Sequence, residues 1–118
     1  MDEYCDFSVR VKKFNGMIVV TLQGEWDFYA RDALHEALLA SDANSDVVVD
    51  ARSASFFDSS ALSELLAFFK RVTATGRRFE LLIGNSNLER LLKMTGLKDL
   101  LLPLPDRVAF LEEHVPAG

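Results

Sequence analysis

The stretch that decides the fold runs from residue 47 to residue 76 and reads VVVDARSASFFDSSALSELLAFFKRVTATG. It opens with a β-branched run, Val47-Val48-Val49, which ends at Asp50 and has the pattern of a central strand covered on both faces. A helical pattern begins after Asp58 and ends at Gly76. The apolar side of this helix is expected to consist of Leu62, Leu65, Leu66, Phe69 and Val72.

On the N-terminal side of this stretch, the sequence predicts a hairpin and a helix. Residues alternate from Phe7 to Lys13, and the run from Met17 to Leu22 is rich in β-forming residues. Between the two lies Asn15-Gly16, the strongest two-residue hairpin signal. An amphipathic helix is then expected from about Phe28 to Ser41, with Asp27 as its N-cap, because apolar residues recur at helical spacing.

On the C-terminal side, the sequence predicts two further strands and two further helices. Phe79 to Ile83 is expected to form a strand, and Asn85-Ser86-Asn87 to cap the helix that follows. Leu100 to Leu102 is expected to be a short last strand, and Pro105-Asp106 to start a final helix. We expect Val115 to Gly118 to be a frayed end.

The resulting order of elements is β-β-α-β-α-β-α-β-α. Strands separated by helices need crossover connections, so the sheet is expected to be mainly parallel, with an antiparallel N-terminal hairpin. The predicted fold class is therefore α/β, a mixed β-sheet with helices packed on it. In such a fold, functional residues are expected on the loops at the N-termini of the helices.

Composition limits the class of protein and its partners. The chain has 118 residues, 49% hydrophobic and 26% charged, which fits one compact domain over residues 1–118. The single Cys5 cannot form an internal disulfide, and the longest apolar run, Leu65 to Phe69, is too short for membrane insertion. A net charge of −5 argues against nucleic acid as a partner. No targeting segment is visible at the acidic start Met1-Asp2-Glu3, so the cytoplasm is the expected location.

The sequence does not predict an enzyme. A Ser-His-Asp arrangement would need Ser59 or Ser60 near one of the two histidines, His35 and His114, both of which are expected to be exposed. The Gly-x-Ser-x-Gly elbow of hydrolases and the glycine-rich nucleotide-binding loops are missing. One cysteine and two scattered histidines offer no metal-ligand spacing. We therefore expect no catalytic residues, no metal site and no cofactor.

The segment Asp58-Ser59-Ser60 is typical of a helix start that can act as a switch. Asp58 can accept hydrogen bonds from the N–H groups of Ser60 or Ala61, which contributes about 1 kcal/mol. Capping does not explain the two adjacent serines. A phosphate on a first-turn serine would add nearly two negative charges to the surface, which is how a switch can be built.

Four segments in order resemble the signatures of one family. Leu22-Gln23-Gly24-Glu25-Trp26-Asp27 is similar to a Gly-Glu-Leu-Asp turn after a second strand, and Val47-Val48-Val49-Asp50 to a strand that ends in Asp. Phe57-Asp58-Ser59-Ser60-Ala61-Leu62 is similar to an Asp-Ser-Ser-Gly-Leu signature, and Leu91-Leu92-Lys93-Met94-Thr95-Gly96-Leu97 to a Leu-x-x-x-Gly-Leu helix end. The chain thus resembles the STAS domain, the module of anti-sigma-factor antagonists and of the cytoplasmic tails of sulphate transporters, over a core from about Phe7 to Leu111.

The resemblance implies a phosphorylation switch. In antagonists of this family, the first serine after the Asp is phosphorylated by a partner anti-sigma factor that is also an ATP-binding serine kinase, and phosphorylation ends the binding. The matching residue is Ser59, with Ser60 as second choice. The residues implied in partner binding are Glu25, Trp26, Asp27, Asp58, Ser59, Ser60 and Ala61.

Two departures from the family pattern leave alternatives open. Ala61 stands where the signature has Gly, which puts the close approach of a kinase backbone in doubt, and Trp26 replaces the usual Leu. Trp26 forms an aromatic group with Phe28 and Tyr29 that either covers the core or anchors a partner. The alternative function is a STAS interaction module of a transport or signalling complex without phosphorylation. The sequence indicates no particular oligomeric state.

Overall fold

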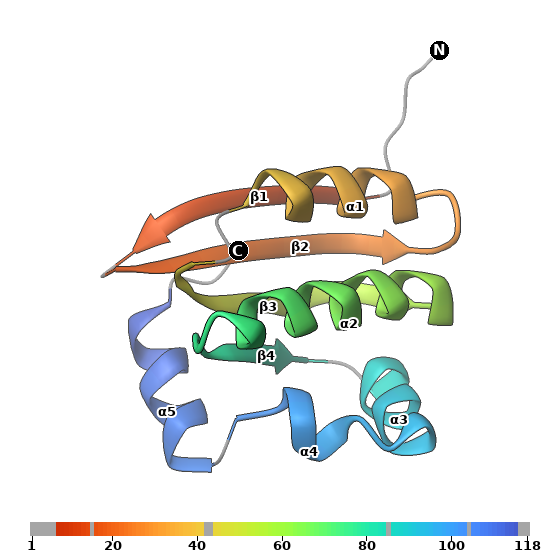
Figure 1. Cartoon of the computed structure of the whole chain (residues 1–118). Helices are drawn as coiled ribbons and strands as arrows, with labels where there is room; N and C mark the ends of the chain where they lie inside the picture. The colour runs from red at the N-terminus through yellow and green to blue at the C-terminus, as the bar shows by residue number, and fades with distance from the viewer. Residues whose placement is uncertain (1–6, 15, 42–43, 85, 104, 116–118) are drawn as a thin grey trace.

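A computed structural model describes residues 7–14, 16–41, 44–84, 86–103 and 105–115 of the chain. One sheet holds four strands in the order β1-β2-β3-β4 (Figure 1). The strands are β1 Phe7–Phe14, β2 Met17–Trp26, β3 Asp46–Phe57 and β4 Phe79–Ile83. β1 and β2 pair antiparallel, whereas β2, β3 and β4 pair parallel. The mixed sheet with an N-terminal hairpin is confirmed.

The helices cover the two faces of the sheet unequally. They are α1 Arg31–Ala40, α2 Ser59–Ala74, α3 Ser86–Thr95, α4 Lys98–Leu101 and α5 Pro105–His114. The crossovers β2-α1-β3 and β3-α2-β4 place α1 and α2 side by side on one face, which we call the front (Figure 1). We call the other face, where Leu111 of α5 packs, the back.

The front face is closed by the larger of two apolar clusters. Alternate residues of the strands, such as Val20, Val49 and Leu81, point to this side and meet Leu34 of α1 and Leu65 of α2. Each of these five side chains is fully buried. At about 25 cal/mol per Å² of buried apolar surface, this packing is the main source of stability that holds the two helices on the sheet.

β3 is longer than the sequence predicts because it is irregular. Its pairing with β2 shifts register between Thr21 and Gln23 and again between Gly24 and Glu25. At both places β3 contributes an extra residue, so the residues that face the front cluster change from the alternate Val47, Val49 and Ala51 to Ala54 and then Phe57. The strand therefore continues through residues 51–57, where no regular alternation marks it.

Three expectations about local structure are wrong, and each has a physical reason. Leu100 to Leu102 is not a strand, because residues 98–101 form the one-turn helix α4 and bury Leu101 against the front cluster. Val115 is not frayed, because its side chain is buried in the back cluster with Leu111; residues 116–118 lie outside the described part. Helix α1 begins at Arg31 and not at Phe28, because residues 28–30 form a turn, and its N-cap is therefore Ala30 and not Asp27.

The back face contains a buried ion pair. Asp50 is 1% exposed, and the Arg52 guanidinium donates to both of its carboxylate oxygens, at 2.8 Å from Nε and 2.9 Å from Nη2. Arg52 Nη2 also donates to the carbonyl oxygen of Val115 at 3.2 Å, which ties the end of α5 to the sheet. The hydrogen bonds to Asp50 raise the pKa of Arg52 above its ordinary value, against the opposing effect of burial.

Candidate functional site

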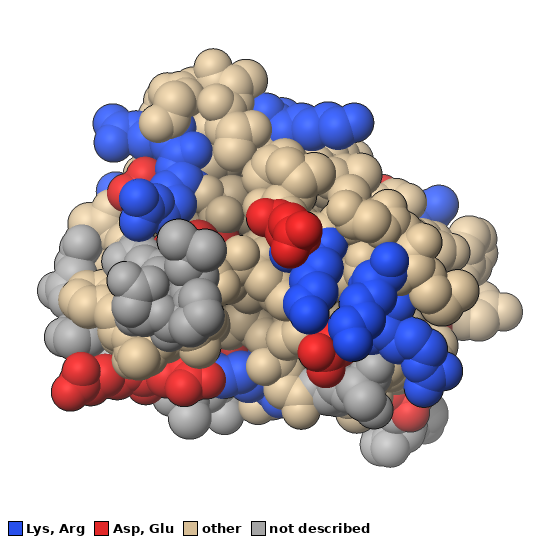
Figure 2. All heavy atoms as spheres, turned by 90° about the horizontal axis from the view of Figure 1, so that it is seen from below, with Lys and Arg blue, Asp and Glu red and all other residues tan. Residues whose placement is uncertain are grey.

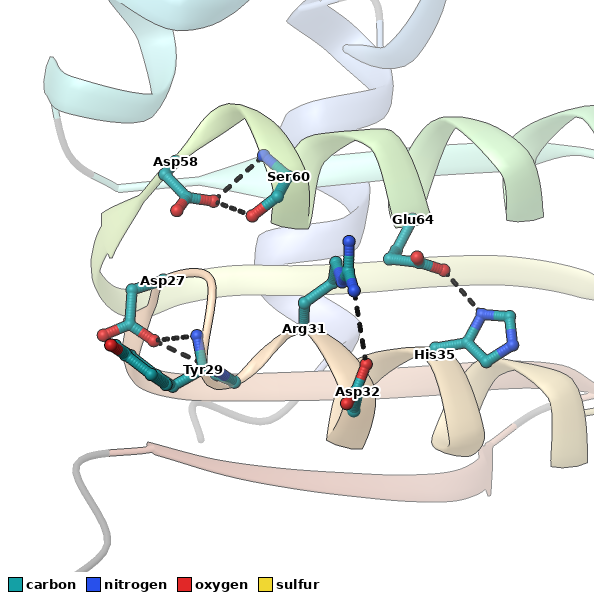
Figure 3. Close-up of polar contacts among 9 residues, drawn as sticks. Asp27, Tyr29, Arg31, Asp32, His35, Asp58, Ser60 and Glu64 are labelled. Carbon is teal, nitrogen blue, oxygen red and sulfur yellow. Dashed lines mark hydrogen bonds and ion pairs between the residues drawn. The ribbon is translucent and has the colours of Figure 1, made fainter.

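The loops that follow β2 and β3 lie next to each other at one edge of the sheet. Trp26 pairs with Phe57 in the parallel register, so both strands end at the same level. The next residue along β3, Asp58, donates its backbone N–H to the carbonyl oxygen of Trp26 at 3.1 Å. Glu25 and Asp27 therefore lie at the same end of the domain as Ser59, and Figure 3 shows Asp27 and Asp58 at this edge.

Asp58 caps α2 as the sequence predicts. Its Oδ1 accepts hydrogen bonds from the backbone N–H groups of Ala61 and of Ser60, both at 3.0 Å, and Figure 3 shows the bond to Ser60. The same oxygen accepts the Ser60 hydroxyl at 2.7 Å. The Ser60 hydroxyl is therefore held against the carboxylate, on the protein side of the helix start.

Ser59 differs from Ser60 in both exposure and bonding. Ser59 is the first residue of α2 and is exposed, whereas Ser60 is half-buried. Within the described part of the chain, no hydrogen bond of the Ser59 hydroxyl occurs, although its carbonyl oxygen accepts from the Ser63 hydroxyl at 2.9 Å. Of the two serines, Ser59 offers a hydroxyl that is both accessible and uncommitted.

A side chain from α3 fixes the end of β3. Asn87 Oδ1 accepts the backbone N–H of Phe57 at 2.8 Å. The sequence suggested a cap of α3 for the segment 85–87, and Asn85 lies outside the described residues. Nothing in the spacing indicated that Asn87 would bond a strand thirty positions earlier, because the contact is set by tertiary packing.

The loop after β2 is a capped turn with two exposed aromatic rings. Asp27 Oδ1 accepts the backbone N–H groups of Tyr29 and Ala30, both at 3.0 Å. The Phe28 and Tyr29 side chains are 57% and 86% exposed, and their rings meet edge to face at 5.8 Å between centroids. Large apolar side chains this exposed are typical of protein contact surfaces.

Trp26 and Ala61 lie beneath the surface. Trp26 is fully buried and its ring lies 5.1 Å from that of Phe7, so it covers the core, and of the three aromatic residues only Phe28 and Tyr29 face outward. Ala61 is also fully buried, so its methyl group points into the front cluster and leaves the helix start open to an approaching backbone. The Ala in place of the signature Gly is thus an internal change.

The chain matches a family model over nearly its whole length. The model is described as the STAS domain, and it matches residues 8–111. The chain belongs to the STAS domain family. The segment 57–62 of this STAS domain is the one that forms the capped start of α2, and the segment 22–27 leads into the adjacent turn.

Several proteins that are similar to this chain are named anti-sigma factor antagonists. The anti-sigma-B factor antagonist of Bacillus subtilis is 31% identical over 97 residues, which cover 81% of this chain and 89% of that protein. An anti-sigma factor antagonist from Mycobacterium paratuberculosis has the same fold, with a TM-score of 0.75 and 24% identity over 88% of this chain and 92% of that one. The Bacillus cell fate determinant SpoIIAA in its phosphorylated form shares the fold with a TM-score of 0.61 and 18% identity, over 90% and 99% of the two chains.

The described ranges contain neither a metal-binding cluster nor a membrane-spanning helix. No group of three or more His, Cys, Asp or Glu side chains there is placed to hold a metal ion. Across the same residues, no helix is both long and apolar enough to cross a membrane. On the face seen in Figure 2, Lys and Arg side chains lie in separate groups with acidic side chains between them.

Proposed function

We propose that this STAS protein is an anti-sigma factor antagonist, that it binds an anti-sigma factor with serine kinase activity, and that phosphorylation of Ser59 ends the binding. The observation that carries the proposal is the difference between the two serines at the start of α2. Ser59 is exposed with an uncommitted hydroxyl, whereas the Ser60 hydroxyl donates to Asp58 at 2.7 Å. The 31% identical relative that is named an antagonist supports the general function.

The chemical step belongs to the partner, which binds the ATP. The Ser59 oxygen attacks the γ-phosphorus of ATP, a new P–O bond forms, and the bond to the β-phosphate oxygen breaks to release ADP. The hydroxyl proton passes to a base of the kinase. This chain supplies the acceptor hydroxyl and holds it at a rigid position, since Asp58 locks the first turn of the helix.

The proposed contact surface combines the two adjacent loops. The exposed rings of Phe28 and Tyr29 supply apolar area, and the carboxylates of Glu25, Asp27 and Asp58 give this edge a negative charge. A partner surface with cations around an apolar pocket would be complementary to it. Trp26 and Ala61 take part only as buried support of these loops.

The charge of a phosphate explains how binding would end. Phosphorylation adds about −1.5 to −2 charge at Ser59, directly beside Asp58. Within a desolvated interface, these like charges repel each other, and burying them costs free energy. The cytoplasm is the location that goes with this function.

The first test maps the phosphate. The protein is incubated with ATP and the kinase recovered with it by pull-down, and the modified residue is located by mass spectrometry. We expect the phosphate on Ser59, no modification of Ser59→Ala, and normal modification of Ser60→Ala. Phosphate only on Ser60 would contradict the assignment, and no phosphate on either residue would favour a constitutive STAS interaction module of a transport or signalling complex.

The second test measures the switch by calorimetric titration against the same partner. Ser59→Asp adds one negative charge at a helix N-terminus, where the dipole tolerates it, so the fold should survive. Its affinity for the partner should fall roughly ten- to a hundredfold, because the new charge stands beside Asp58 in the interface. Ser59→Ala should bind like the parent and resist release by ATP. Equal affinities of the Asp, Ala and parent proteins would contradict the switch.

A further inference from the structure

We propose that Arg31 is the residue that binds the phosphate once Ser59 is phosphorylated. In this state the Arg31 guanidinium would leave its present contacts on α1 and pair with the phosphate at the start of α2. The inference rests on the proposed function, since it concerns the phosphorylated form of the same serine. It assigns a role to a residue outside the family signatures quoted above.

The register between α1 and α2 places Arg31 opposite the first turn of α2, which begins with Ser59. The two helices run parallel, because each follows a strand of the parallel part of the sheet and returns across its front. His35 of α1 bonds Glu64 of α2 at 2.7 Å between Nδ1 and Oε1 (Figure 3). Residues four positions apart lie one above the other on a helix face. One turn back from His35 is Arg31, and one turn back from Glu64 is Ser60, the neighbour of Ser59.

A second contact farther along the helices supports this register. Arg71 Nη2 of α2 donates to the carbonyl oxygen of Leu38 in α1 at 2.9 Å. The contacts at His35 and at Leu38 thus follow the same order on both helices, from the site toward their C-termini. In Figure 3 the Arg31 side chain extends from α1 toward the first turns of α2, where Ser60 and Glu64 lie.

Arg31 differs from His35 and Arg71 because it has no strong partner on the opposite helix in the described part of the chain. Its Nη2 lies 3.7 Å from Asp32 Oδ1, and the two side chains are 38% and 87% exposed. An ion pair this exposed contributes little to stability. Its guanidinium also lies 4.9 Å from the ring centroid of Phe28, a half-exposed cation–π contact. Both contacts are weak enough for a phosphate to replace them.

Near the start of α2, the Arg31 guanidinium is suited to bind a phosphate, and the neighbouring carboxylates are not. A guanidinium presents a planar set of N–H donors that matches two phosphate oxygens. Asp58 already accepts three hydrogen bonds at Oδ1, and Glu64 is paired with His35. Both carboxylates repel a phosphate, and so does the exposed Asp32, so a cation that faces it from α1 would offset that repulsion.

The pairing would also change the surface that the partner contacts. Arg31 now lies over the ring of Phe28, which packs against Tyr29. Movement of the guanidinium toward the phosphate would uncover that face of the Phe28 ring and remove a positive charge from beside the aromatic pair. Phosphorylation at α2 would thereby alter the loop after β2 as well.

The experiment introduces phosphoserine at position 59 during translation, so it needs no kinase. The pH midpoint of the phosphate is read from its ³¹P NMR resonance in the full chain and in Arg31→Gln, Arg31→Lys and Arg10→Gln. Every protein of the series, including the reference protein, also carries His35→Gln, so that an imidazole does not contribute to the pH dependence of the ³¹P resonance. Arg10→Gln is the matched control, because Arg10 is exposed on β1 and points to the back of the sheet.

We expect the midpoint to be higher in Arg31→Gln than in the reference protein by about 0.5 or more on the pH scale, because a nearby cation favours the dianion. The midpoint in Arg31→Lys should stay close to that of the reference protein, since lysine keeps the positive charge. The midpoint in Arg10→Gln should equal that of the reference protein. Equal midpoints with and without Arg31 would overturn the inference, as would an equal rise in Arg10→Gln. If Arg31 lowers the pH midpoint of the phosphate, the inference holds even when no kinase modifies Ser59. Failure of the inference and failure of the proposed function can therefore be told apart.

Discussion

The front of the sheet is closed by a large apolar cluster under α1 and α2, whereas the back is closed by a small apolar cluster together with the ion pair of Asp50 and Arg52. The front packing follows from helices and strands whose apolar residues recur at regular spacing. The back packing depends on a contact between Arg52 and Val115, which are 63 positions apart. The two faces therefore differ in the interactions that stabilise them. The packing of the front can be predicted from the sequence, whereas the contact at the back cannot.

The candidate site belongs to the front layer. Its two loops lead directly into α1 and α2, whose positions are fixed by the front cluster. The back layer lies at the opposite end of β2, where Met17 and Val19 meet Leu111. Changes on the back should therefore alter the stability of the chain with little effect on the geometry of the site.

The largest expected effect comes from removing a front-core side chain. Leu65→Ala should lower the free energy of unfolding by about 3 to 5 kcal/mol, because Leu65 is fully buried between α2 and the sheet and its loss leaves a cavity. Leu111→Ala on the back should cost less, about 2 to 3 kcal/mol, since α5 can relax against a smaller cluster. Urea unfolding measures both values. Equal costs would mean that the two faces are equally well packed.

The next effect concerns the ion pair on the back. Asp50→Asn should lower the free energy of unfolding by about 2 to 4 kcal/mol, because it removes the negative charge that accepts both guanidinium hydrogen bonds of Arg52 in a mostly buried position. The expected cost is below that of a fully buried pair, since the Arg52 side chain is 22% exposed. The matched control is Asp32→Asn, where the Asp side chain is 87% exposed and the cost should stay within about 0.5 kcal/mol. A similar small cost for Asp50→Asn would show that the pair does not stabilise the fold.

The part of the fold that sequence could predict is the part with local signals. The run Val47 to Val49 and the cap at Asp58 are each recognisable within a few residues, and each is present in the structure. The same holds for the hairpin, where Gly16 adopts a φ of +78°. The capped helix start of the candidate site was predictable for the same reason. The apolar face of α2 is present as well, but it buries Phe68, and the predicted Leu66 and Phe69 are only half-buried.

The rest of the fold depends on contacts between distant residues. The end of β3 lacks alternation because two extra residues shift its register against β2. The leucines of Leu100 to Leu102 predict a strand, but residues 98–101 form a helical turn that buries Leu101 at the front cluster. The bond of Asn87 to Phe57 and the anchor of Val115 to Arg52 have no sequence signal, because one partner in each bond is a backbone group, which nearly every residue offers.

At the site, a smaller effect is expected from the cap of α2. Asp58→Ala should cost about 1 to 2 kcal/mol of unfolding free energy, because three donors lose their acceptor at Oδ1. Asp58→Asn is the matched variant, since Asn caps helices about as well as Asp while removing the charge. Urea unfolding of the two variants therefore measures the effect of the cap, which only Asp58→Ala removes. The affinity of Asp58→Asn for the partner measures the effect of the charge. An equal loss of stability in both variants would contradict a simple capping role.

A still smaller effect is expected from the turn after β2. Asp27→Ala should cost about 0.5 to 1 kcal/mol, because among the described residues the Asp27 carboxylate accepts only from the N–H groups of Tyr29 and Ala30, ahead of the helix. If Asp27 also contacts the partner, its loss should weaken the complex in a calorimetric titration at a temperature where both proteins are folded. Unchanged affinity would mean that Asp27 only holds the turn that presents Phe28 and Tyr29.

The smallest expected effect is the dependence of the back ion pair on alkaline pH. The pKa of Arg52 is raised in the folded chain, chiefly by its hydrogen bond to Asp50. A group whose pKa is higher in the folded state contributes stability that is fully present below its unfolded pKa and is lost only as the pH rises through the folded value. For arginine, that loss lies far above the range in which the protein would be handled.

The difference in unfolding free energy between the parent and Asp50→Asn should therefore stay constant, within about 0.5 kcal/mol, from about pH 7 to about pH 9. Other groups that titrate in this range affect both proteins equally, so the difference isolates the pair. Urea unfolding at three pH values within the range measures it. If the difference instead shrinks as the pH rises, a group other than Arg52 supplies the positive charge that pairs with Asp50. The back of the sheet would then be closed by a contact other than the 2.8 Å ion pair between Arg52 Nε and Asp50 Oδ1.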